Sequence, residues 1–398
     1  MSTPPATSRI AAVDLIRGAV MILMAIDHVR VYSGLPAGGP TPGIFFTRWV
    51  THVCAPAFIF LAGTSAFLYG RTHRDLSRFL LTRGAWLVFL ELTVIRMAWT
   101  FNVDFRTYLL AGVIWVIGWS MILMAALVRL PVKAVGVIGV LVIALHNAVM
   151  WPLVSALPDG LALLKNILYV GFFTDEPARL GPGGPPLIVL YTIIPWIGVM
   201  AAGYAFGHIL TLEPARRNRL CLQIGLGATA LFLILRGFNL YGDPRPWGAA
   251  AAAAAADAGP RLPALLSFLN TSKYPASLLF LLMTLGPTIA LIPPLERARG
   301  GVAAAVAVFG RVPFFFYVLH IPLIHALALV VSTIRLGEVS PWLFTNHPMG
   351  NPDPPDGYPW SLALLYAVWL ATIVLLYFPC RWFADRKARA KSPWLSYL

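Results

Sequence analysis

The sequence predicts an all-α, polytopic membrane protein of about ten transmembrane helices, with both termini in the cytoplasm. Of its 398 residues, 59% are hydrophobic and only 12% are charged, whereas soluble domains carry about 25% charged residues. Apolar runs long enough to cross a bilayer recur along the whole chain. The loops between these runs alternate between basic and non-basic, as the positive-inside rule expects. These observations exclude a soluble globular fold and predict one integral-membrane domain over residues 1–398.

The expected helices follow from the apolar runs in chain order. The first run comes after a short polar N-terminus, MSTPPATSRI, which has no signal-peptide cleavage pattern, so we expect this run to be retained as a helix. The ten runs begin near residues 11, 44, 79, 107, 132, 187, 219, 275, 302 and 360. No internal repeat of fixed period relates them, which argues against a transporter built from inverted repeats.

Loop charge predicts the orientation of these helices. The short basic segments are 71–78, 129–133, 216–219, 297–299 and the C-terminal tail from Arg381. Because every second loop is basic, we expect both termini on the cytoplasmic side of a bacterial inner membrane. The longer loops on the other side are rich in Gly and Pro, which favours lids over an outward-facing site. These outer loops are 152–186, 241–274 and 334–359, and the alanine run 249–256 is interpreted as a tolerated insertion.

The charge and cysteine content narrow the set of partners. A net charge of +14 does not indicate a nucleic-acid partner here, because the basic residues lie between apolar runs rather than in a stripe. Cys54, Cys221 and Cys380 are far apart, so they suggest neither a disulfide framework nor a metal site. We therefore expect no metal cofactor, and we expect membrane lipid as a partner. A homodimer is neither predicted nor excluded.

The first apolar run, VDLIRGAVMILMAIDHVR, places Arg17 and His28 inside an expected transmembrane helix. An ionisable group in lipid costs several kcal/mol, so such residues normally face a protein interior or a watery cavity. Eleven residues make about three helical turns, so the two side chains share a face about 16 Å apart along the axis. One face of this helix thus offers a cation near the inner membrane surface and an imidazole near the outer one.

Further polar side chains fall within the expected helices. With the predicted orientation, several of them join His28 in the outer half of the membrane or at its outer edge, namely Arg48, His52, Arg96, Arg236, Asn239, Lys273 and either His320 or His325. Glu91 and Arg96 both lie in the third run, where we expect them to form a buried structural pair. The polar groups therefore converge on an outward-facing cavity, and Arg17 alone lies near the cytoplasmic surface.

This arrangement suits acyl transfer. Histidine titrates closest to neutral pH, so His28 can take a proton from an attacking hydroxyl or amine. Asn239, Arg236 or Lys273 could stabilise the oxyanion that develops. A CoA thioester carries phosphates at one end and its acyl carbon at the other, a separation that matches Arg17 and His28 in scale. An arginine and a histidine on one helix equally suit a transporter or flippase of a small solute, and the residues alone leave this alternative open.

Several segments resemble known sequence families. RGAVMILMAIDH resembles the Arg–His signature in the first helix of the transmembrane acyltransferase superfamily, whose members decorate extracytoplasmic glycans. Others resemble bacterial members of the heparan-alpha-glucosaminide N-acetyltransferase catalytic-domain family. These are PAFIFLAGTSAFLYG (56–70), PWIGVMAAGYAFG (195–207), LRGFNLYGDPRPW (235–247), SKYPASLLFLLMTLGP (272–287) and FGRVPFFFYVLHIPLIH (309–325). Their order and spread extend the resemblance over most of the chain.

The resemblance implies an acyl-CoA-dependent membrane acyltransferase. It implies transfer of an acetyl or other short acyl group from cytoplasmic acetyl-CoA to an amine or hydroxyl of an extracytoplasmic sugar or glycan. We expect His28 to act as general base, Asp27 to orient it, and Arg17 to bind the phosphates of the donor. The expected acceptor-binding residues are Arg236, Asn239, Lys273 and His320.

The chain departs from the family pattern at one position. In the lysosomal branch the active histidine lies in the first luminal loop, whereas this chain has no histidine between His28 and His52. The role is therefore carried over to His28, at the Arg–His signature. Direct transfer to the acceptor and transfer through an acyl-histidine both stay open.

Overall fold

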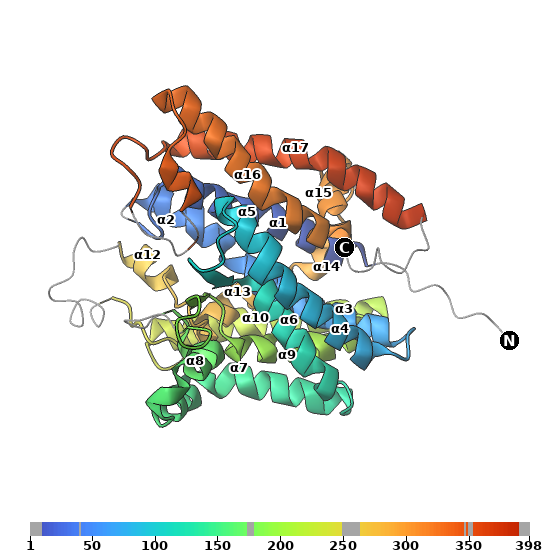
Figure 1. Ribbon diagram of the computed structural model, residues 1–398. Coiled ribbons are helices and arrows are strands. Elements are labelled where there is room, and N and C mark those ends of the chain that lie inside the picture. Colours follow the sequence, from blue (N-terminus) through green and yellow to red (C-terminus); the bar gives the residue numbers. More distant parts are fainter. Residues whose placement is uncertain are drawn as a thin grey trace.

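The chain is mostly helical. The computed structural model describes residues 10–39, 41–172, 179–248, 263–345, 348 and 353–389 (Figure 1). Within these residues, six helices are long and apolar enough to cross a membrane. They are Pro42–Gly70, Val132–Ser155, Pro214–Gly237, Leu278–Leu295, Pro313–Leu336 and Leu362–Arg389. The predicted helical membrane protein is thus confirmed, while the count of ten spans and the cytoplasmic termini stay predictions.

The first half of the chain forms helices with one short strand between them. The elements are α1 (Ala11–Ser33), α2 (Pro42–Trp49), a 3₁₀ turn (Val50–Val53), α3 (Cys54–Gly70), α4 (Leu76–Leu90), a π-helical turn (Glu91–Ile95), α5 (Arg96–Thr100), β1 (Leu109–Ala111), α6 (Val113–Leu127) and α7 (Val132–Ser155). Two stretches of the outer loop that follows are also helical. They are a 3₁₀ turn (Asp159–Leu161) that leads into α8 (Ala162–Lys165), and a π-helical turn (Asn166–Val170).

The second half opens on a strand that pairs with β1. The elements are β2 (Leu187–Val189), α9 (Ile193–Ile209), α10 (Pro214–Gly237), α12 (Ala264–Leu269), α13 (Leu278–Ala290), α14 (Ile292–Leu295), α15 (Gly301–Arg311), α16 (Pro313–Leu336), a 3₁₀ turn (Pro341–Phe344) and α17 (Leu362–Arg389). The alanine run 249–256 lies outside the described residues, as do parts of all three long outer loops.

Three of the expected runs differ from single helices. The runs expected near 107 and 187 begin as strands, because Leu109–Ala111 and Leu187–Val189 pair as a parallel two-stranded sheet before α6 and α9 start. The run expected near 302 is broken into α15 and α16 at Val312, whose backbone is not helical. Pro313 follows directly, and a proline disfavours helical backbone in the residue before it.

The outer helices leave apolar surface uncovered. Only 22% of the most apolar window of α7, α10 and α17 is buried in the protein, against 61% for Leu278–Leu295. Large side chains such as Val140, Leu141 and Leu145 of α7 are about half exposed. Exposed apolar surface on this scale needs a partner, and for helices of this length that partner is the bilayer.

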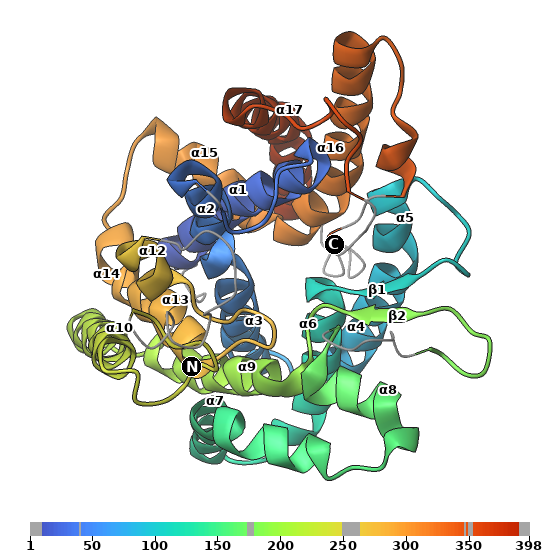
Figure 2. The ribbon, with the colours of Figure 1, turned by 90° about the vertical axis from the view of Figure 1, so that its left-hand side faces the viewer.

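The helices are arranged around α3 and α9. In both views α16 and α17 lie on one side of the molecule and α7 on the opposite side (Figures 1 and 2). Helix α3 packs against α9 and α1, and α1 packs in turn against α15 and α16. The two helices that carry the predicted histidines, α1 and α16, are therefore neighbours.

Glycines allow the central helices to touch. A β-carbon added at Gly203 of α9 would lie 2.0 Å from the carbonyl oxygen of Phe60 in α3. One added at Gly63 of α3 would lie 2.0 Å from the carbonyl oxygen of Met200 in α9. Small residues at such crossings let helix backbones approach closely, as membrane helix pairs require.

We expect Gly203→Ala to lower the free energy of unfolding by about 1–3 kcal/mol, because the added methyl group must push α9 away from α3. Thermal unfolding of the purified protein in detergent measures the change. The matched control is Gly227→Ala in α10, since a β-carbon there meets no atom within 4 Å. Equal melting temperatures for the two variants would contradict this description of the α3–α9 contact.

Candidate active site

A cavity of about 1010 Å³ opens among the helices, and its lining includes the segments 240–245 and 270–275. Its wall includes side chains from α1, α2, α3 and α16 and from the loop before α13. The chemically active members of this wall are Asp27, His28, Arg48, His52, Lys273 and Tyr317. The predicted general base therefore faces a space large enough for a small-molecule substrate.

The hydrogen bonds of His28 determine where its lone pair lies. Nδ1 of His320 is 2.6 Å from the carbonyl oxygen of Tyr317, and a carbonyl can only accept, so this nitrogen carries the proton. A neutral imidazole has one N–H, so Nε2 of His320 is an acceptor. It lies 2.6 Å from Nδ1 of His28, which must therefore donate. With both rings neutral, His28 keeps its lone pair on Nε2.

Neighbouring rings fix the orientation of this pair. The rings of His28 and His320 stack with centroids 4.8 Å apart. Trp99 meets His28 edge-on, with centroids 5.0 Å apart. His320 itself is fully buried, so bulk water does not compete with His28 for its acceptor nitrogen. Nε2 of His28 receives no hydrogen bond from any described residue, and it is the nitrogen suited to accept a substrate proton.

Asp27 lies next to His28 on the cavity wall, but it does not bind the imidazole. Its carboxylate accepts a hydrogen bond from Nε of Arg30 at 2.8 Å, one turn further along α1. We expected Asp27 to orient His28, whereas in the structure the hydrogen-bond partner of the His28 ring is His320. Asp27 still places a negative charge beside the ring, and a neighbouring anion favours the imidazolium form.

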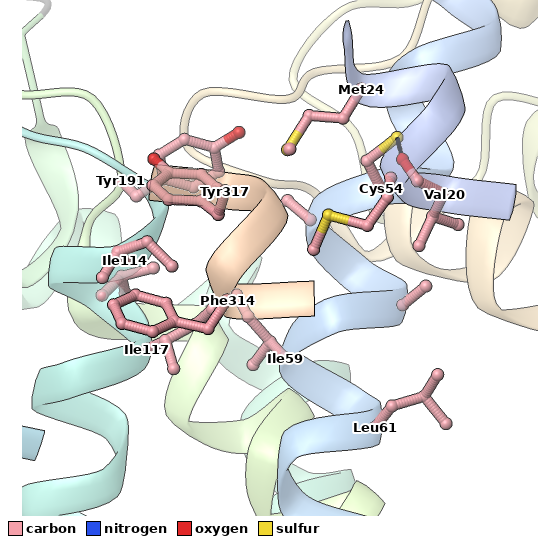
Figure 3. Close-up of a cluster of buried hydrophobic side chains, with 14 of the residues drawn as sticks. Val20, Met24, Cys54, Ile59, Leu61, Ile114, Ile117, Tyr191, Phe314 and Tyr317 are labelled. Atoms are coloured by element: carbon pink, nitrogen blue, oxygen red, sulfur yellow. Dashed lines mark hydrogen bonds between the residues drawn. The ribbon is translucent and has the colours of Figure 1, made fainter. Parts of the chain in front are cut away.

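Arg17 lies toward the other end of α1. Its guanidinium donates to the carbonyl oxygen of Leu61, at 3.1 Å, and to the hydroxyl of Ser65, both in α3. Arg17 is not among the residues of the cavity wall. In Figure 3, Met24, which lines the cavity, and Leu61, whose carbonyl oxygen binds Arg17, lie at opposite ends of a cluster of buried apolar side chains.

Arg236 and Asn239 also lie outside the cavity wall. Arg236 is 1% exposed, and its guanidinium is occupied by backbone oxygens. These are the carbonyls of Phe268 at 2.9 Å, Ser267 at 2.9 Å and Arg245 at 2.6 Å. Asn239 bonds the backbone of Trp247 in both directions. Both side chains therefore hold the loop that follows α10, and the structure does not bring them to His28.

The expected pair of Glu91 and Arg96 is wrong. Glu91 is 1% exposed and accepts hydrogen bonds from backbone N–H groups at the start of α6, a position that favours negative charge. Arg96 instead donates to the backbone of the following loop, at Asn102, Asp104 and Tyr108. The π-helical turn Glu91–Ile95 separates the two residues, so the spacing of an ordinary helix does not apply to them.

The comparisons with known proteins bear on this site. The model of the family described as "Heparan-alpha-glucosaminide N-acetyltransferase, catalytic" matches residues 9–239, more than half of the chain. The chain belongs to this family. Its membership indicates a membrane acetyltransferase and confirms the resemblance stated above. The search of curated proteins gives no match.

The match to the N-acetyltransferase family covers α1 to α10 and thus includes Arg17, Asp27 and His28. Lys273 and His320 lie beyond it, yet the structure brings both to the same cavity region as His28. Lys273 is 7% exposed and lines the cavity. Of the predicted acceptor-binding residues, these two are therefore the ones that the fold places near the general base.

Sequence reasoning missed some members of the candidate site. Tyr317 supplies the carbonyl that sets the tautomer of His320, and its hydroxyl lies 3.5 Å from a Glu91 carboxylate oxygen. The three-residue spacing of Tyr317 and His320 on a helix could have indicated the contact between His320 and the Tyr317 carbonyl from the sequence. No comparable signal indicated Trp99, because its contact with His28 depends on how α1 packs against α5.

Proposed function

We propose that this protein is an integral-membrane acetyltransferase that moves an acetyl group from acetyl-CoA to an amine or hydroxyl of an extracytoplasmic sugar. The observation that carries the proposal is the hydrogen-bonded pair of His28 and His320 at the cavity wall. It leaves a free lone pair on Nε2 of His28, in a chain of an N-acetyltransferase family. Such a nitrogen is suited to general base catalysis.

In the proposed reaction the acceptor nitrogen or oxygen attacks the thioester carbon while His28 Nε2 takes its proton. The C–S bond then breaks, and the imidazolium returns the proton to the departing sulfur, so that CoA leaves as the thiol. Nδ1–H of His28 stays bonded to His320 throughout. The Asp27 carboxylate, adjacent on α1, stabilises the transient imidazolium. Lys273, which also lines the cavity, is proposed to bind the acceptor.

The donor is proposed to approach from the Arg17 end of α1. Arg17 lies about 16 Å along the helix from His28, on the scale of an extended pantetheine arm. Buried apolar side chains such as Val20 and Leu61 lie in this region, so the proposal requires them to move aside when the donor binds. We expect Arg17→Ala to raise the KM for acetyl-CoA more than the KM for the sugar, because a cation near the donor phosphates is lost. Steady-state kinetics with each substrate varied in turn measures both constants. The reverse pattern would contradict the role of Arg17.

Transfer across the membrane is tested in sealed proteoliposomes that contain glucosamine, with acetyl-CoA labelled on the acetyl group supplied outside. The proposal predicts labelled N-acetylglucosamine inside the vesicles. Product formed only when both substrates share one compartment would contradict transfer across the membrane. Glucosamine efflux without acetyl-CoA and without product would indicate the transporter instead.

A further inference from the structure

One part of the cavity wall carries polar side chains without partners. Lys273 and His52 are each 7% exposed, and neither ring nitrogen of His52 has a hydrogen-bond partner. Among the described residues, none forms a hydrogen bond or ion pair with the ammonium of Lys273 or the guanidinium of Arg48. Buried polar groups are nearly always paired, so the unpaired side chains of the buried Lys273 and His52, with the half-buried Arg48 beside them, indicate a missing acceptor.

These three side chains belong to one cluster. Nζ of Lys273 lies 5.3 Å from the centre of the Tyr274 ring, and Cζ of Arg48 lies 5.9 Å from the same point. Both cations are close enough to His52 to interact with it electrostatically. Lys273 interacts in the same way with His28. The cluster is therefore adjacent to the proposed general base.

The acidic residues Asp27 and Asp243 of the cavity wall offer Arg48 and Lys273 no hydrogen-bonded counter-charge, and Asp27 attracts both cations only from a distance. Asp27 is engaged by Arg30 at 2.8 Å. Asp243 faces Arg236 at 4.0 Å and accepts hydrogen bonds from the backbone of Arg245 and Ser272. Two positive charges, on Arg48 and Lys273, are thus left without a counter-charge at hydrogen-bond distance.

We propose that Arg48, His52 and Lys273 form a phosphate-binding subsite, and that the acceptor is a sugar that carries a phosphate monoester. A dianion matches the two fixed cations, and charge-assisted hydrogen bonds to such oxygens are strong. A neutral sugar would leave the ammonium of the buried Lys273 without an anionic partner at hydrogen-bond distance, which is unfavourable. The assignment of this phosphate to the acceptor rests on the proposed transferase function.

The donor also carries phosphates, so the source of the phosphate has to be distinguished. The subsite is built from α2, the 3₁₀ turn before α3 and the loop before α13, at the cavity end of the molecule. Arg17, the proposed donor contact, does not line the cavity and binds the carbonyl oxygen of Leu61, which lies at the opposite end of the apolar cluster of Figure 3 from Met24 of the cavity wall. This separation assigns the subsite to the acceptor.

The first test measures binding without acetyl-CoA, by calorimetry on the purified full chain in a phosphate-free maltoside detergent. Glucosamine 6-phosphate is compared with glucosamine, which lacks only the phosphate. We expect wild type to bind the phosphorylated sugar more tightly and Lys273→Met to lose that preference by about 10- to 100-fold. Lys273→Arg should retain it, and so should the charge-matched control Arg106→Met, since Arg106 is exposed outside the cavity. Equal binding of the two sugars by wild type would overturn the subsite.

The second test uses turnover to identify the source of the phosphate. Acetyl-CoA is compared with S-acetyl-pantetheine, which has no phosphate, in wild type and Lys273→Met. The proposal expects the variant to keep its preference for acetyl-CoA and to lose its preference for the phosphorylated acceptor. The opposite result would overturn the acceptor assignment. If no acetyl transfer occurs but phosphate-dependent binding is lost in Lys273→Met, the transferase function fails and the phosphate-binding site stands.

Discussion

Replacing His28 by alanine is expected to lower the rate of acetyl transfer by about 10²- to 10⁴-fold, the range that general base catalysis contributes. The reason is local: Nδ1 donates to His320, and the lone pair on Nε2 faces no donor among the residues that the structure describes. Without the ring, the attacking amine or hydroxyl of the acceptor sugar must give its proton to water. Product formation under saturating substrates, followed by mass spectrometry, measures the effect.

The matched control for this variant is His73→Ala. His73 is an exposed histidine in the loop between α3 and α4, so its loss should leave the rate unchanged. Size-exclusion profiles and melting temperatures show whether both variants fold. A folded His28→Ala protein with the wild-type rate would contradict the assignment of the general base.

Replacing His320 by leucine is expected to lower kcat by about 10²-fold with little change in either KM. His320 is fully buried and touches the reaction only through His28, so it is a positioning residue. Without its acceptor nitrogen, Nδ1 of His28 is left without a hydrogen-bond partner, and the tautomer with the lone pair on Nε2 is no longer selected. The rate should fall while substrate binding persists.

Two comparisons separate this positioning role from a loss of packing. His320→Gln provides an amide oxygen that can accept the Nδ1 proton, so we expect it to retain more activity than His320→Leu. On a His28→Ala background, His320→Leu should cause no further loss, because residues that act as a unit are not additive. Independent, multiplying effects of the two substitutions would show that His320 acts by another route.

Much of the fold was predictable because the bilayer sets strong rules. Length and apolarity identified the helices, and Arg17 and His28 were found because charged groups are rare in such runs. The break at Val312 and the pairing of β1 with β2 were not predicted. The strand pairing depends on contacts between segments distant in sequence, such as Leu110 with Ile188, for which hydrophobicity gives no signal. The break has a local cause in Pro313, which the apolarity of the run conceals.

The candidate site was predictable only in part, for the same reason. His28 and His320 are 292 residues apart, and their pairing follows from the packing of α1 against α16. The predicted depth in the membrane grouped Arg236 with the acceptor-binding residues, but depth does not determine the direction in which a side chain points. The backbone oxygens of the loop after α10 take its donors, whereas Lys273 reaches the cavity.

The measurement that tests the proposed function most directly is CoA release by the purified protein in nanodiscs, with acetyl-CoA and a panel of amino and hydroxyl sugars. Wild type is compared with His28→Ala at equal concentrations of folded protein. We predict free CoA and acetylated sugar in equal amounts, with both dependent on His28. A folded protein that neither binds nor consumes acetyl-CoA, or one that releases CoA equally well without His28, would contradict the proposal.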